Sequence, residues 1–487
     1  MKRIVCSLFA AIAMLTAPLV RAENVTVEQA KDAAAHYLQH NTSLTRITPE
    51  QLTLAHQWNN DELGVASMYL FTAPEEGWII MAATTAMDPV VAFTDEGVFD
   101  GRMAPAQAEW LDSYSDMVCA VQNLDNEKSL GDSPEWTVLA THSLYGSKAS
   151  VTLLKTRWDQ GGPSGTDYNM FSPVVNDSVA PTGCVATALA QICNYYKFPK
   201  QPKGRIVYTN NRPMETGGEA VRMEINLDTV PPLDYSLMPL EVKPSTSMER
   251  RREVSRLAYY VGMSAYMQYG GSLSGTTDQR AVSGMRNNMK FTRGTLLDRR
   301  STGNDTNFIN NIRRELKNNR PLYMSGTSGG SGAHAGGHAW VCDGYQDNDS
   351  TKFHMNWGWG GTGNAFYNLV TNNLSISGLG YNFRMNQSVI LNMVPPQDST
   401  DIQIGVAEVE DMVALGVAYP NPATLSVVLP YSTREAADLQ VYSISGRLVE
   451  SRHVMAGDGE ITLRVDSLPA GIYIYRMGNA HGKFVVR

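Results

Sequence analysis

The sequence predicts an α+β protein of several domains that ends in a separate all-β sandwich. Its 487 residues give room for about three domains of ordinary size. Hydrophobic residues form 43% of the chain and charged residues 18%, which is the balance of a folded globular protein. Helix-like and strand-like segments are mixed up to about residue 394, whereas only short strand-like segments follow residue 418.

The first 22 residues have the pattern of an export signal. Lys2 and Arg3 precede an apolar run over residues 4–20, and small residues then suit cleavage after Ala22. A membrane anchor is the alternative interpretation. It is disfavoured because the run is shorter than the ~20 residues that a span needs and because Pro18 interrupts its end.

Residues 23–137 predict a small α+β domain that a protease could remove. We expect a helix over Val27–Leu38 and another over Gln107–Leu124. Strands are expected around residues 68–71, 77–81 and 90–93. The polar, turn-rich segment 126–134 is typical of an exposed boundary where proteolysis occurs.

Residues 138–398 predict an α+β unit of catalytic size, with helices from Cys184 and over Met248–Met267 and glycine-punctuated strands from Pro321 onward. A polar linker is expected over residues 399–417. Residues 418–487 then predict a small β-sandwich. Its expected strands lie at residues 425–429, 439–443, 461–465 and 471–476.

Charge and cysteine content limit the possible functions. Forty basic and 48 acidic side chains give a net charge of -8, so no nucleic-acid partner is expected. Five cysteines are too few for a disulfide scaffold. If Cys6 leaves with the signal and Cys119 with the removable domain, three remain, and an odd number leaves at least one free thiol. A surviving free thiol in an exported protein is a candidate nucleophile.

Cys184 is the candidate for that thiol. Val185, Ala188, Leu189 and Ile192 recur at helical spacing, so a helix should begin at about Cys184 itself. Unpaired backbone N–H groups and the positive dipole end at a helix start favour the thiolate, so we expect a lowered pKa. The alternative is an ordinary cysteine that packs in a helix, which is our interpretation of Cys193.

A cysteine nucleophile needs a general base, and His338 is the best candidate. It follows a run of small residues, 325–337, and opens a strand-like segment that would hold the imidazole still. His334 is the rival, but it lies inside the run. The run is a weak candidate for a phosphate-binding loop, because no Gly-Lys-Ser/Thr sequence follows it.

Two further groups complete the candidate site. Asn356 could orient the imidazole through its amide oxygen, and the adjacent Trp357 and Trp359 could shield that hydrogen bond. Gln160 lies upstream of the nucleophile, and its amide could join the Cys184 backbone N–H in an oxyanion hole. Each of these groups has a simpler interpretation when it is considered alone. The two indoles could pack in the core, and Gln160 could be a surface glutamine in a turn.

Four separated segments together resemble the streptopain family of papain-like cysteine proteases, which includes interpain-like and periodontain-like enzymes. They are residues 160–163, 182–192, 337–344 and 356–361, in the chain order Gln, Cys, His, Asn. The resemblance implies a two-subdomain papain-like fold and an endopeptidase of broad protein and peptide substrates, with an apolar residue preferred two places before the cut. It also implies that Trp357 shields the imidazole, and that residues 23–137 are a pro-domain that inhibits the precursor until proteolysis removes it.

The C-terminal block resembles the sorting domain of type IX secretion substrates, through residues 419–423, 441–447 and 468–473. The resemblance implies a bacterial protein that meets outer-membrane secretion machinery and ends secreted or on the cell surface. A carbohydrate-binding or adhesive sandwich is the alternative.

Two other functions were weighed against a protease. A metal site from His338, Cys342 and His354 fits no compact zinc spacing, and we expect neither metal nor cofactor. A catalytically dead surface adhesin would keep the fold but lack a reactive thiolate at Cys184.

Overall fold

The computed structural model describes the chain in two compact units, residues 1–402 and 403–487. The expected signal, most of the expected linker, residues 328–336 before His338 and residues 129–131 of the segment 126–134 lie outside the described residues. Those described are 23–128, 132–140, 150–213, 217–299, 305–327, 337–347, 351–369, 387–396, 413–415, 418–433, 436–444, 447–455, 457–477 and 480–487. Residues 413–415, expected in the linker, form a strand instead.

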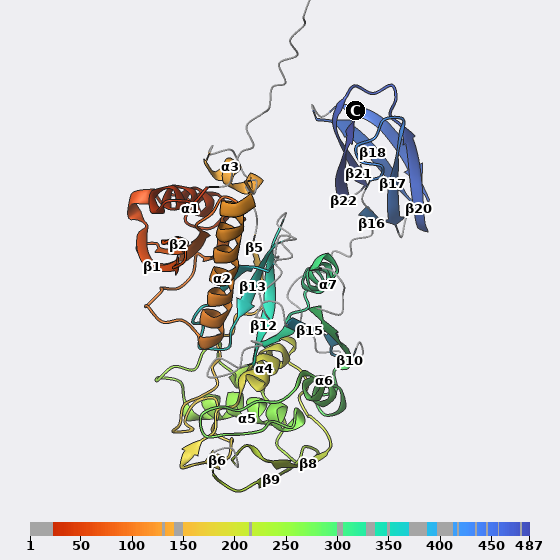
Figure 1. Ribbon diagram of the computed structural model, residues 1–487. Coiled ribbons are helices and arrows are strands. Elements are labelled where there is room, and N and C mark those ends of the chain that lie inside the picture. The colour runs from red at the N-terminus through yellow and green to blue at the C-terminus, as the bar shows by residue number, and fades with distance from the viewer. Residues whose placement is uncertain are drawn as a thin grey trace, which may run out of the picture. The chain divides into compact units, whose positions relative to one another are not determined.

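The N-terminal part of the first unit is the expected small α+β domain (Figure 1). A capping box starts its first helix, because Gln29 N donates to Thr26 Oγ1 and Thr26 N donates to Gln29 Oε1 at 2.8 Å. The helices are α1 (Val27–Asn41), α2 (Pro105–Lys128) and α3 (Pro134–Ala140). The strands are β1 (Thr53–Asn60), β2 (Val65–Thr72), β3 (Trp78–Ala82) and β4 (Val90–Thr94).

Two features of this part differ from the expectation. Residues 126–128, expected in an exposed boundary, are the last turn of α2. The helix α3 then packs against α1, and the Trp136 indole on it donates to Thr84 O at 2.9 Å. Strand β1 was not expected, because most of its side chains are exposed and its sequence lacks apolar alternation.

The helical part of the following segment surrounds one apolar core. Helix α4 packs against α5, and α5 packs against α6. The elements of this part are α4 (Cys184–Tyr196), α5 (Met248–Ser264), α6 (Asp278–Asn287) and the hairpins β6 (Val174–Val175) with β7 (Ser178–Val179) and β8 (Arg205–Asn210) with β9 (Val221–Asn226).

The remaining strands form the second part of the catalytic-sized unit, and helix α7 (Asp305–Lys317) packs on them. They are β5 (Ser150–Thr152), β10 (Thr292–Asp298), β11 (Leu322–Thr327), β12 (Gly337–Gln346), β13 (Lys352–Asn356), β14 (Ala365–Asn368) and β15 (Gln387–Val394). Helix α4 lies against β12, so the helical part and the sheet meet along these two elements.

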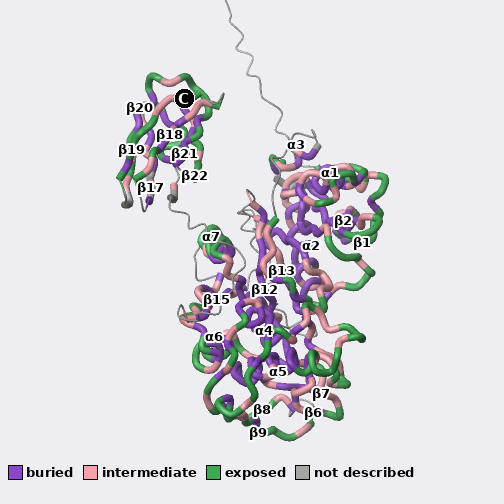
Figure 2. Tube along the Cα trace, turned by 180° about the vertical axis from the view of Figure 1, so that it is seen from behind, coloured by how far each residue is buried: buried purple, intermediate pink, exposed green. Residues whose placement is uncertain are grey.

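One antiparallel sheet runs through both domains of the first unit. Its order is β1-β2-β3-β4-β14-β13-β12-β11-β15-β10, with β5 paired to β12. The domains join where β4 pairs with β14, through Phe93 opposite Phe366 and Ala92 opposite Tyr367. Helix α2 lies beside β12 and β13 in both views, and one apolar core contains side chains of α2 and of both strands (Figures 1 and 2).

The second unit is a β-sandwich of two antiparallel sheets around its own core, in agreement with the expectation. The sheets have the orders β16-β17-β20 and β19-β18-β21-β22. Its strands are β16 (Val413–Leu415), β17 (Ser426–Thr433), β18 (Ala437–Ser443), β19 (Leu448–Val454), β20 (Gly457–Arg464), β21 (Gly471–Met477) and β22 (Ala480–Val486).

The predicted fold class is confirmed: an α+β unit with helical and sheet parts, an N-terminal α+β domain and a C-terminal sandwich. Within the described ranges, no helix has both the length and the apolar character needed to cross a membrane.

Candidate active site

The thiol of Cys184 lies at the start of helix α4, as expected. Gly183 precedes it with φ of 86°, a left-handed conformation that side chains disfavour. A Cβ at this position would also lie 2.7 Å from Ser274 O and 3.0 Å from Met267 Sδ. Only glycine therefore allows the chain to approach this closely and turn into the helix with Cys184 as its first residue.

The environment of the Cys184 sulfur raises its pKa, so the expected lowering is wrong for the full-length chain. Burial is the main cause, because the side chain is only 9% exposed, and the Asp278 carboxylate acts in the same direction. Backbone N–H groups of Ala339, Val185 and Cys184 itself favour the thiolate but do not outweigh burial. In this form the sulfur is held as a thiol.

His338 is the second residue of β12, at the strand end that the sequence predicted. Its Nε2 lies 2.9 Å from the carbonyl oxygen of Trp357, which can only accept, so Nε2 carries the hydrogen. Burial lowers the imidazole pKa to about 4, although the Trp357 carbonyl and the Glu109 carboxylate oppose that shift. The ring is therefore neutral at pH 7, and Nδ1 is left as its proton acceptor.

The structure does not bring His338 and Cys184 into a hydrogen bond within the part of the chain that it describes. The contact between their segments is made by the next residue, Ala339, whose backbone N–H faces the sulfur. The two candidate residues thus lie on adjoining elements, α4 and β12, without forming the thiolate–imidazolium pair of an active cysteine nucleophile.

In this structure the Asn356 side chain bonds to groups other than the imidazole that it was expected to orient. Its Oδ1 accepts from Gln191 Nε2 at 3.1 Å and from Gly358 N at 3.2 Å, and its Nδ2 donates to Thr156 O at 2.7 Å. The reason is that the main-chain carbonyl of Trp357 already takes the Nε2 hydrogen of His338. Asn356 instead holds the backbone on either side of that carbonyl.

Two indoles flank the imidazole. The Trp357 ring is fully buried, with its centroid 6.4 Å from that of His338. The Trp340 ring lies 6.3 Å from His338 and is nearly parallel to it, at 11°. Trp340 was not predicted as a site residue, although the sequence could have indicated it. It follows His338 by two residues on the same strand, and residues at that spacing share one face of a sheet.

Gln160 lies beside the nucleophile segment. Its main-chain oxygen accepts from Thr182 N at 2.9 Å, which ties it to the residues just before Cys184. The side chain is 9% exposed, and its amide has no hydrogen-bond partner among the described residues. An amide that bonds to no described residue is available to a substrate oxygen.

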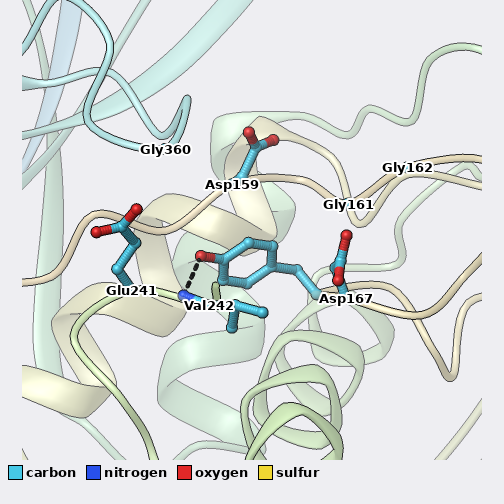
Figure 3. A pocket seen from close by; sticks show the side chains of 8 residues that line it. Asp159, Gly161, Gly162, Asp167, Glu241, Val242 and Gly360 are labelled. Carbon is cyan, nitrogen blue, oxygen red and sulfur yellow. Dashed lines mark hydrogen bonds between the residues drawn. The ribbon is translucent and has the colours of Figure 1, made fainter. Parts of the chain in front are cut away.

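An acidic cavity of about 280 Å³ adjoins this segment (Figure 3). Tyr168 OH accepts from Val242 N at 2.9 Å in its wall, and burial raises the pKa of Asp159. Figure 3 shows carboxylates of Asp159, Asp167 and Glu241 around the tyrosine ring. The cavity is lined by Asp159, Gly161, Gly162, Asp167, Tyr168, Glu241, Val242 and Gly360.

Helix α2 of the N-terminal domain covers the sheet side of the site. The Glu109 carboxylate is close enough to influence the His338 ring. The Trp110 ring lies 4.9 Å from that of Tyr367 at 78°, an edge-to-face contact, and Tyr367 in turn contacts Trp357 at 5.4 Å. The N-terminal domain thus packs directly on the side chains that surround the imidazole.

His338, Cys342 and His354, the alternative metal ligands, have other partners or surroundings in the structure. His354 Nδ1 lies 2.6 Å from the buried Asp343 carboxylate. Across the described ranges, no group of three or more histidine, cysteine, aspartate or glutamate side chains is arranged to hold a metal ion.

Three family models match this chain in the order of its domains. Residues 22–118 match the Spi protease inhibitor family. Residues 158–367 match the peptidase C10 family, and residues 417–487 match the secretion system C-terminal sorting domain.

Individual proteins are similar over the same regions. The thiol protease/hemagglutinin PrtT of Porphyromonas gingivalis is 27% identical over 491 residues, which cover 97% of this chain and 51% of that protein. This chain thus spans about half the length of that relative. Streptopain of Streptococcus pyogenes is 26% identical over 76% of this chain and 91% of its own length. The structure of prointerpain A from Prevotella intermedia shares the fold, with a TM-score of 0.55 and 22% identity over 71% of this chain and 99% of that one.

Proposed function

We propose that the chain is a secreted cysteine endopeptidase made as a latent precursor, because residues 158–367 match the peptidase C10 family and residues 22–118 match a protease-inhibitor family. The observation that carries the proposal is the meeting of α4 and β12, where the backbone next to His338 faces the Cys184 sulfur. In the active enzyme the imidazole of His338 would lie beside this thiol. Its substrates would be proteins and peptides, with an apolar residue favoured two places before the cut.

The chemistry follows from the protonation states. His338 Nδ1 is free to take the Cys184 proton while Nε2–H stays on the Trp357 carbonyl, which stabilises the imidazolium that forms. The thiolate attacks the peptide carbonyl, and the Gln160 amide with the Cys184 N–H donates to the oxyanion. His338 then protonates the leaving amine, and water that it deprotonates releases the acyl group.

Latency is the second part of the proposal. Helix α2 places Glu109 and Trp110 against the surroundings of His338, and in this full-length form the dyad is not paired. The N-terminal domain would act as an intramolecular inhibitor until proteolysis removes it. The match of residues 22–118 to a protease-inhibitor family supports this role.

The third part of the proposal is export, and it rests on the C-terminal sandwich. Its match to a secretion system C-terminal sorting domain supports export through an outer-membrane machinery, so that the enzyme works outside the cell or on its surface. An N-terminal signal over residues 1–22 would deliver the chain to that machinery.

A pair of cysteine substitutions on one helix tests the catalytic role. We expect Cys184→Ala to abolish casein hydrolysis and labelling by a papain-class epoxide, because the nucleophile is gone. Cys193→Ala is the matched control: Cys193 is also buried on α4, and burial raises its thiol pKa, so activity should remain. Casein hydrolysis at the wild-type rate by the Cys184→Ala protein would end the proposal.

A further inference from the structure

Gln191 is a fully buried polar side chain on the nucleophile helix. It is 0% exposed and follows Cys184 by seven residues, which is about two turns of α4. Residues at this spacing share one face of a helix, so Gln191 and Cys184 lie on the same side of α4. A buried amide in a helix requires partners for both its donor and its acceptor.

Gln191 finds these partners in a closed ring of three residues, made by the side chains of Gln191 and Asn356 and by the hydroxyl and main-chain oxygen of Thr156. Its Oε1 accepts from Thr156 Oγ1 at 2.8 Å, and its Nε2 donates to Asn356 Oδ1 at 3.1 Å. The ring closes where Asn356 Nδ2 donates to Thr156 O at 2.7 Å. All three residues are at most 4% exposed, so water does not compete for these bonds.

Each member of the ring lies on a segment that carries a different part of the proposed machinery. Gln191 is on the helix that begins at Cys184. Thr156 is four residues before Gln160. Asn356 directly precedes Trp357, whose carbonyl oxygen takes the Nε2 hydrogen of His338.

We propose that Gln191 is a positioning residue that fixes these three segments relative to one another. The inference rests on the proposed function and adds a residue to it. An amide is required because one group must donate to Asn356 Oδ1 while accepting from Thr156 Oγ1. Leucine offers neither bond, and a glutamate carboxylate of the same shape cannot donate.

The test compares Gln191→Leu and Gln191→Glu with the wild type. Each full-length chain is cut by an unrelated serine protease, so that no variant depends on its own activity for processing. We expect kcat for a peptide substrate to fall by about 10²-fold in both variants, since a misplacement of about 1 Å costs that much. KM should change by less than about threefold, because the ring does not touch substrate.

A second readout does not involve substrate. The rate of Cys184 alkylation by iodoacetamide, followed against pH, reports when the thiol ionises. We expect the alkylation midpoint to shift to higher pH in both variants, because the Trp357 carbonyl no longer holds the His338 ring in place. A role in stability alone would lower the melting temperature and leave this midpoint unchanged.

Asn210→Ala is the matched control. Asn210 is also a 0% exposed amide, and it bonds to Tyr269 O and Arg212 N away from the ring. It should lower stability without moving kcat or the alkylation midpoint. Wild-type kcat and midpoint in both Gln191 variants would overturn the inference, whereas a wild-type enzyme without peptidase activity would overturn the proposed function instead.

Discussion

At the scale of single residues, the full-length chain holds its two reactive groups in their uncharged forms. Burial raises the thiol pKa of Cys184 and lowers the imidazole pKa of His338 to about 4. Both shifts have the same cause, because a buried group without a charged partner avoids ionisation. Pairing the two groups would reverse both shifts, since each charge would stabilise the other.

The His338 shift predicts a pH dependence of precursor stability. The folded pKa of about 4 lies below the ordinary value of 6.5, so between these pH values the unfolded chain binds a proton that the folded chain does not. This contribution to stability is therefore full above about pH 6.5 and is lost as pH falls toward 4. It amounts to at most about 3 kcal/mol.

Urea unfolding of a Cys184→Ala precursor from pH 4 to 7 measures this contribution. The same protein with His338→Gln is the control, because glutamine does not titrate. We expect the histidine protein to lose stability relative to the glutamine protein as pH falls below about 6.5. Parallel stability curves would show that the imidazole is not held neutral by burial.

The positions of Cys184 and His338 in their elements were predictable, whereas their partners were not. Local spacing places Cys184 at a helix start, and a strand-like segment places His338 near its beginning. The partner of the imidazole in this structure is a main-chain carbonyl, for which the sequence carries no residue-type signal, and the predicted bond from Asn356 is not formed. The role of Gln191 was not predicted, because a single polar residue among the apolar residues of α4 carries no local sign of its partners.

At the scale of elements, helix α2 connects the N-terminal domain to the site. Its Trp110 is 1% exposed and contacts Tyr367 on β14, next to the β4–β14 join. Stacking of Phe93 on Phe366 at 5.3 Å continues this contact across the join. The two domains therefore share one packed interior, and the N-terminal domain cannot leave without exposing aromatic side chains.

Trp110→Ala is expected to weaken the hold of the N-terminal domain. Loss of a buried indole costs about 3–5 kcal/mol, so a Cys184→Ala precursor should melt at lower temperature. In the protein that keeps Cys184, Trp110→Ala should speed activation. The lag before peptide hydrolysis should therefore be shorter than in the wild type. Leu54→Ala on β1 is the control, because Leu54 is 41% exposed and lies on the outer strand; an unchanged lag for Trp110→Ala would contradict the role of α2.

Most elements were predictable, but not how they pair. The helices and the apolar strands β2, β3 and β4 follow from periodicity, and β1 was missed because it is largely exposed. Nothing local indicates that β4 pairs with β14, because residues 92 and 367 are far apart in the chain. This pairing is set by the packing of whole domains.

At the scale of the whole molecule, the chain separates into two units with independent cores. We predict that a chain ending at residue 402 keeps the melting transition of the first unit and its peptidase activity after processing. In its native host this shortened protein should remain inside the outer membrane, because the sorting domain is missing. Calorimetry and cell fractionation measure the two outcomes.

Two results would contradict this division. If truncation abolished the main melting transition, the first unit would depend on the sandwich for folding. If the shortened chain still reached the medium, the C-terminal unit would not be the export signal. Composition shifts predict three domains, whereas the structure divides the chain into two units. The sheet that joins the first two predicted domains could not be foreseen, since it depends on contacts between residues far apart in the chain.

The shortness of β14 has a consequence for the processed enzyme. If the proposed processing removes β1–β4, β14 becomes the outermost strand and loses the partners that β4 provides. Long bare edges template fibrils, whereas very short ones recruit other chains poorly. With only four residues, β14 would offer little for such recruitment after the proposed processing.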